Sequence, residues 1–182
     1  MRRAENITLD LLHERHPGLT PALAQSYVEA ACVCLARHHQ PPVVFSVNNA
    51  GDKLDRTVDF LIPDERTKNA NANEIDATEA GAYGLSLAAV ESVVGMVAVR
   101  RAETKTGADW YIAPTGELLE DLESCVRLEV SGISAGTSSD VIRRLQEKIA
   151  QAGKGKSNLP AIAAVVGFKV LEVAISPLGV KA

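Results

Sequence analysis

The segment from Glu74 to the C-terminus constrains the fold most, because its hydrophobic pattern switches between the helical and the extended period. Residues 74–94 carry apolar side chains at helical spacing, and Gly95 follows as a C-terminal stop. Three runs typical of strands come next, at 96–101, 109–113 and 125–130. A second helical stripe covers 138–152, and 161–175 returns to one or two strands. This order predicts a mixed sheet with helices on its faces.

Residues 1–73 predict a smaller N-terminal unit. Thr20 suits a helix N-cap and Pro21 the first helical position. The expected elements are a helix over 21–40, strands at 43–47 and 57–62, a turn at 48–52 and a polar loop or linker at 63–73. We therefore expect an annex of a helix and a β-hairpin with its linker at 1–73, and a core domain at 74–182. The fold class is α/β, with α+β left open.

Composition limits the classes of protein to which this chain can belong. Of its 182 residues, 46% are hydrophobic but only 4% aromatic, so the core has to consist mainly of Ala, Val, Leu and Ile. The net charge of -4 excludes a strongly basic protein that coats nucleic acid, although it permits a local basic patch. No apolar run reaches the roughly 18 residues of a membrane span. The three cysteines do not indicate a disulfide framework, and we expect a soluble, cytoplasmic protein.

Two acidic residues stand at the ends of neighbouring predicted strands. Asp109 begins the second strand directly after a glycine turn, and Glu129 lies near the end of the third. Two carboxylates so placed can converge on one point, and a hard cation such as Mg²⁺ prefers oxygen ligands. A bound Mg²⁺ activates water and stabilises charge on a phosphate during transfer. Two simpler interpretations stay open: Asp109 as a turn residue beside Gly107, and Glu129 paired with Arg127 or Arg101 across the sheet.

The element order and these two acids resemble the restriction-endonuclease-like nucleases, the PD-(D/E)xK superfamily. Asp109, in the run 107–111 (Gly-Ala-Asp-Trp-Tyr), matches the family's Asp on the second strand, and Glu129 matches its Glu on the third. The resemblance implies a nuclease that hydrolyses phosphodiester bonds with Mg²⁺ or Mn²⁺. It further implies that Asp109, Glu129 and the Val130 carbonyl bind the metal, and that Glu79 on the first helix assists catalysis.

The resemblance covers 74–182 and departs from the family pattern at one important position. The family's lysine, two residues after the Glu, falls on Ser131, which cannot supply a positive charge. Some members draw this lysine from the following helix, where Lys148 is the candidate, with Gln151 one turn further on. If neither reaches the site, the chain is a catalytically inactive interaction protein of the same fold, a subunit of a nucleic-acid-processing or defence assembly.

Basic residues on and after the last helix are candidates for contacts with nucleic acid, with DNA favoured over RNA. They are Arg143, Arg144, Lys154 and Lys156. The simpler interpretation is a solvated helix face and loop. A homodimer is plausible for a nuclease of this fold, because such enzymes often act on two strands; a larger protein assembly is the alternative.

Two further motifs do not support a site. The run 150–157 ends like a phosphate-binding P-loop, but Ala150 replaces its first glycine and the run follows a helix instead of a strand. Cys32, Cys34, His38 and His39 cluster on the first helix, but no second Cys or His pair completes a zinc site. We expect these thiols to be small buried core residues.

Overall fold

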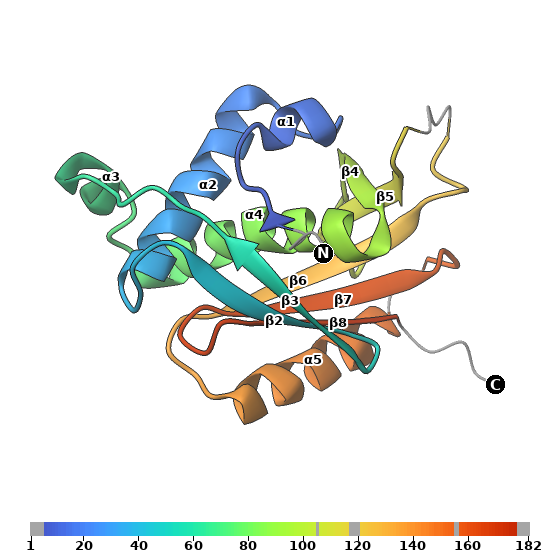
Figure 1. Cartoon of the computed structure of the whole chain (residues 1–182). Helices are drawn as coiled ribbons and strands as arrows, with labels where there is room; N and C mark the ends of the chain where they lie inside the picture. The colour runs from blue at the N-terminus through green and yellow to red at the C-terminus, as the bar shows by residue number, and fades with distance from the viewer. Residues whose placement is uncertain (1–5, 105, 117–120, 155–156, 178–182) are drawn as a thin grey trace, which may run out of the picture.

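The computed structural model describes residues 6–104, 106–116, 121–154 and 157–177. These residues form one mixed sheet with helices on both faces (Figure 1). The strands are β1 (Asn6–Ile7), β2 (Val43–Asn49), β3 (Asp52–Val58), β4 (Met96–Arg101), β5 (Trp110–Pro114), β6 (Val126–Ile133), β7 (Ala161–Gly167) and β8 (Glu172–Pro177). The helices are α1 (Leu12–Arg15), α2 (Pro21–Ala36), α3 (Glu65–Ala70), α4 (Glu74–Val94) and α5 (Ser138–Ala152). The prediction of a mixed α/β fold is confirmed.

The strand order of the sheet is β1-β3-β2-β8-β7-β6-β5-β4. The pairs β1/β3, β2/β8 and β6/β7 are parallel, whereas β2/β3, β4/β5, β5/β6 and β7/β8 are antiparallel. α4 packs on one face and α5 covers β6, β7 and β8 on the other (Figure 1). The predicted strands of Asp109 and Glu129 are therefore neighbours in one sheet, and the helix of Glu79 packs on that sheet.

The N-terminal segment 1–73 contributes strands to this same sheet. β2 and β3 form the predicted hairpin, and Ala50 and Gly51 make its two-residue turn with positive φ angles of 53° and 102°. β3 ends at Val58, so the second strand predicted at 57–62 was placed too far along the chain. β2 pairs with β8 in parallel. The segments expected as annex and core domain thus share one sheet and one hydrophobic core.

The polar stretch 63–73, predicted to be a loop or linker, contains the short helix α3. The Asp64 side chain caps this helix by accepting a hydrogen bond of 2.8 Å from the Thr67 N–H. α3 has six residues and buries no side chain. Because α3 has no buried apolar face, its residues show no helical spacing of hydrophobic side chains, and the sequence did not predict this helix.

α4 lies very close to α2 on one side and to β6 on the other, and a glycine stands at each of these two contacts. A Cβ atom on Gly81 would lie 2.9 Å from the Ala31 backbone nitrogen in α2. A Cβ atom on Gly132 in β6 would lie 2.6 Å from the Thr78 carbonyl oxygen in α4. Gly81 therefore permits close packing of α4 against another helix, and Gly132 permits the close approach of α4 to the sheet.

α5 has one apolar face and a strong N-terminal cap. Thr137 and Asp140 form a capping box, in which each side chain accepts a hydrogen bond from the backbone N–H of the other residue. These hydrogen bonds lower the pKa of Asp140 to about 2. Val141 is fully buried against Val165 and Ala174 of the sheet. Among the described residues, no helix combines the length and the hydrophobicity that crossing a bilayer requires.

We predict that Gly81→Ala destabilises the protein, although helix propensity alone would favour alanine by about 1 kcal/mol. The added methyl group would press against the α2 backbone, and overpacking of this kind costs about 1–3 kcal/mol. Urea unfolding followed by circular dichroism measures the change. An increase in stability would show that α2 and α4 can separate at little cost.

Candidate functional site

The candidate site lies where β5 separates from β6. The two strands pair as far as Trp110 opposite Leu128, and the Asp109 N–H donates a last hydrogen bond of 2.8 Å to the Leu128 carbonyl. β6 then continues to Ile133, paired with β7 on its other side. Beyond the last pair, the Asp109 side chain takes the place of a strand partner, because its Oδ2 accepts a 2.8 Å hydrogen bond from the Val130 N–H. This local separation exposes the edge of β6.

Glu129 lies on the α5 side of β6, whereas its neighbours Leu128 and Val130 belong to the core under α4. Its Oε1 accepts a hydrogen bond of 2.7 Å from Nζ of Lys148 in α5. Only 6% of the Glu129 side chain and 19% of the Lys148 side chain is exposed. Lys148 therefore reaches Glu129, as predicted. The alternative partner Arg127 does not contact Glu129 and donates to backbone carbonyls instead.

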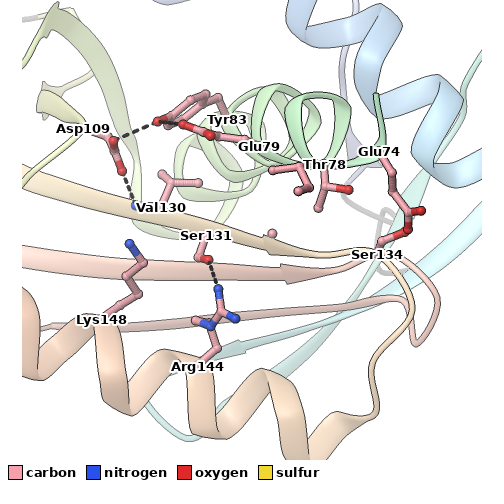
Figure 2. A pocket seen from close by; sticks show the side chains of 12 residues that line it. Glu74, Thr78, Glu79, Tyr83, Asp109, Val130, Ser131, Ser134, Arg144 and Lys148 are labelled. Carbon is pink, nitrogen blue, oxygen red and sulfur yellow. Dashed lines mark hydrogen bonds between the residues drawn. The ribbon is translucent and has the colours of Figure 1, made fainter. Parts of the chain in front are cut away.

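α4 contributes a tyrosine that connects two of the predicted acidic residues. The Tyr83 hydroxyl lies 2.8 Å from Asp109 Oδ1 and 3.1 Å from Glu79 Oε1 (Figure 2). Arg101 in β4 donates to the same hydroxyl at 3.0 Å and to the Asp109 backbone carbonyl at 3.0 Å. Glu79 is thus joined to the site through Tyr83, and Arg101 lies 3.7 Å from Asp109 Oδ1.

Two clefts meet at this point and share Asp109 and Lys148 in their walls. The first has a volume of about 480 Å³ and lies between α4, the exposed edge of β6 and α5 (Figure 2). The second has a volume of about 700 Å³ and lies between the β4–β5 turn and the end of α5. Glu79, Tyr83, Val130 and Ser131 line the first, and Arg101, Glu129, Gln151 and Lys154 line the second. A chain-like ligand crossing both clefts would pass directly over Asp109.

Burial controls the charge state of Glu129. Desolvation raises its pKa, the hydrogen bond from Lys148 lowers it, and the negative charge of Asp109 raises it again. The net result is a raised pKa for the Glu129 carboxyl.

The donor set at this site suits a hard divalent cation bound mainly by water and two carboxylates. In the described part of the chain, no three Asp, Glu, His or Cys side chains gather closely enough to hold a metal ion. Mg²⁺, however, usually keeps several waters and takes only one or two protein carboxylates. Asp109 and Glu129, which line the second cleft together, are the two candidates for this role. The Val130 N–H points to Asp109, and the carbonyl of the same residue points to the same side of a strand, so it also faces the exposed edge.

The basic residues predicted to contact nucleic acid occupy different positions. Arg144 lines the first cleft and donates a 3.1 Å hydrogen bond to Ser131 Oγ. Lys154 lines the second cleft. Arg143 is largely exposed, pairs with Asp140 at 2.7 Å and lines neither cleft. Lys156 lies outside the described residues. Of the three members of this group that the structure describes, Arg144 and Lys154 line a cleft together with Asp109.

The cysteines and histidines near the end of α2 do not form a site with one another. Cys32 and Cys34 are buried free thiols, and burial raises the pKa of each, so both are poor nucleophiles. His39 Nε2 contacts the backbone carbonyls of Phe168 and Lys169 at 3.0 and 3.1 Å. The expectation that these thiols belong to the core is confirmed.

Two residues of the site were not predicted to belong to it. Tyr83 falls within the apolar period of α4, so the sequence gives it the appearance of a core residue. Arg101 was named only as a possible partner of Glu129 across the sheet, whereas the structure places its guanidinium over the Tyr83 and Trp110 rings, 4.5 and 5.2 Å from their centroids. Comparison of the chain with family models, curated proteins and solved structures gave no match in any of the three.

We predict that Glu129→Gln raises the melting temperature at pH 8. A raised pKa in the folded state means that protonated Glu129 favours folding below its unfolded pKa of about 4.3, and that this contribution is lost as pH rises through the folded pKa. Glutamine imitates the protonated form, so the gain should vanish below about pH 4. Scanning calorimetry at both pH values measures it, with Glu147→Gln on the exposed face of α5 as the control. A lower melting temperature at pH 8 would mean that the bond with Lys148 outweighs the burial.

Proposed function

We propose that this protein is a Mg²⁺-dependent nuclease of the restriction-endonuclease-like type. The observation that carries the proposal is the pair of Glu129 and Lys148 at 2.7 Å, next to Asp109 at the exposed edge of β6. Two acids can bind a metal ion that activates water, and a lysine beside them can stabilise the negative charge that develops on a phosphodiester during hydrolysis. The order of α4, three strands (β4, β5 and β6), α5 and two closing strands (β7 and β8) supports it as well.

Each residue then has a role that follows from its position. Asp109, Glu129 and the Val130 carbonyl would hold the cation, which supplies the Lewis acid that activates water and neutralises the phosphate. Lys148 approaches Glu129 from α5 and would stabilise the negative charge that develops on the phosphate. Arg144 and Lys154 stand in the two clefts on either side and would contact neighbouring phosphates. Glu79 would assist from α4 through Tyr83.

The first test of this proposal is metal binding. At a Mg²⁺ concentration a hundred times the dissociation constant, binding to the folded state stabilises it by about 2.7 kcal/mol. For a chain of this length that stabilisation raises the melting temperature by about 5–10 °C. We expect this shift with Mg²⁺ or Mn²⁺ in differential scanning fluorimetry, and we expect it to disappear in Asp109→Ala. An equal shift in both proteins would place the cation elsewhere.

The second test is cleavage of nucleic acid. With Mg²⁺, the purified protein should cut DNA or RNA supplied as labelled single strands and duplexes, and Glu129→Ala should reduce the rate to background. Lys148→Ala should fold and lose most of the activity, about 10²–10³-fold if its charge acts as one electrostatic donor in the transition state. Arg143→Ala, which changes a basic residue of the same helix outside both clefts, is the matched control. Equal background cleavage by wild type and Glu129→Ala would contradict the enzyme proposal.

A second candidate function is an interaction protein that keeps the fold without catalysis. Ser131 favours it, because this residue lacks the charge of the family's lysine. The absence, among the described residues, of three Asp, Glu, His or Cys side chains gathered for a metal ion favours it as well. Such a protein would act as a subunit of a nucleic-acid-processing or defence assembly. Nucleic acid binding by the wild type that is unchanged by EDTA and by Glu129→Ala, without cleavage, would support this function over the nuclease.

A further inference from the structure

The Tyr83 hydroxyl has more hydrogen-bond partners than one hydrogen can serve. Arg101 Nη2 donates to its oxygen at 3.0 Å, so one acceptor position is filled. Asp109 Oδ1 at 2.8 Å and Glu79 Oε1 at 3.1 Å are both acceptors when ionised. The phenol carries a single hydrogen, and at any moment only one of these carboxylates receives it. The shorter distance favours Asp109.

The surroundings of Tyr83 keep this hydroxyl in place. The residue is 7% exposed, and its ring packs against Tyr27 with centroids 5.4 Å apart. The Arg101 guanidinium lies over the same ring, 4.5 Å from its centroid. Burial raises the pKa of Tyr83 well above its usual value, so the hydroxyl retains its hydrogen at physiological pH. The tyrosine is thus a fixed donor.

Asp109 is held at both of its carboxylate oxygens. Tyr83 donates to Oδ1, and the Val130 N–H donates to Oδ2 at 2.8 Å. Two donors on opposite oxygens fix the rotation of a carboxylate, whose remaining lone pairs are then directed to one region. Here both clefts meet at Asp109. Groups that orient a metal ligand in this way affect metal affinity about 10–100-fold.

We propose that Tyr83 is a positioning residue that orients Asp109 for a divalent cation, and that Glu79 acts on the site only through the Tyr83 hydroxyl. This inference rests on the proposed function, because it assigns Asp109 the role of metal ligand. It also changes the expected role of Glu79 from a residue that assists at the metal to one that competes with Asp109 for a single hydrogen. Tyr83 itself does not contact the reacting groups.

The experiment measures Mn²⁺ affinity of the whole chain by calorimetry and by the electron paramagnetic resonance signal of free Mn²⁺. Tyr83→Phe keeps the ring and its stacking but removes the hydroxyl, and it should weaken binding by about 10-fold or more. Tyr27→Phe is the control, because this ring packs on Tyr83 while its hydroxyl makes none of the hydrogen bonds that join Tyr83 to Asp109, Glu79 and Arg101. Glu79→Gln added to Tyr83→Phe should produce no further loss of affinity.

The outcomes separate this inference from the proposed function. If wild type and Tyr83→Phe bind Mn²⁺ equally, Tyr83 has no positioning role, and the metal site still stands. If Glu79→Gln weakens binding further in the Tyr83→Phe background, Glu79 acts directly and that part is overturned. If wild type binds no Mn²⁺ at Asp109, the proposed function and this inference both fall. A purely structural Tyr83 would change the melting temperature without changing Mn²⁺ affinity.

A second variant covers the case in which Tyr83→Phe does not fold. Arg101→Lys keeps the positive charge near Asp109 but loses the planar fork that donates to the Tyr83 hydroxyl and to the Asp109 carbonyl. Because Arg101 is 45% exposed, this change should leave the fold intact. We expect Mn²⁺ binding to weaken several-fold, and wild-type affinity would overturn the proposed network.

Discussion

The close approach of α4 to its neighbours is the constraint on which both the fold and the site depend. Gly81 allows the α2 backbone to contact α4, and Gly132 allows α4 to lie directly on β6. Tyr83 follows Gly81 by two residues, and Gly132 follows Val130 by two residues on the same strand. The contacts that pack the core therefore also set the distance between the Tyr83 hydroxyl and the edge of β6, where Asp109 lies. A larger residue at either glycine would move the site together with the helix.

Glu129 shows a conflict between stability and chemistry. The buried carboxylate carries a raised pKa, so its charged form opposes folding, and Lys148 offsets only part of that cost. The raised pKa therefore predicts that an amide is more stable than a carboxylate at this position. A buried ionisable group with a shifted pKa is typical of a functional site. There a desolvated carboxylate beside a cation serves the function of the protein at a cost in stability.

The parts of the structure that the sequence predicts are those with a local signal. α4, α5 and the strands after Gly95 have a clear hydrophobic period and clear ends. Asp109 and Glu129 were singled out from the order of these elements, whereas Lys148 became a candidate through the family resemblance. The pairing of β2 with β8 joins residues more than 120 positions apart, and no local pattern specifies it. Tyr83 has an apolar ring and a polar tip. The helical spacing of apolar residues assigns the ring to the core but does not indicate the direction of the hydroxyl.

Two cations of α5 meet residues on one face of β6 because the residue spacings of the helix and the strand nearly match. Glu129 and Ser131 are two residues apart and share the α5 face of the strand, a distance of about 6.6 Å. Lys148 and Arg144 are four residues apart on the helix, a rise of about 6 Å. Because the two steps are nearly equal, Lys148 meets Glu129 at 2.7 Å while Arg144 meets Ser131 at 3.1 Å. Ser131 therefore has a cation of α5 beside it, as Glu129 has.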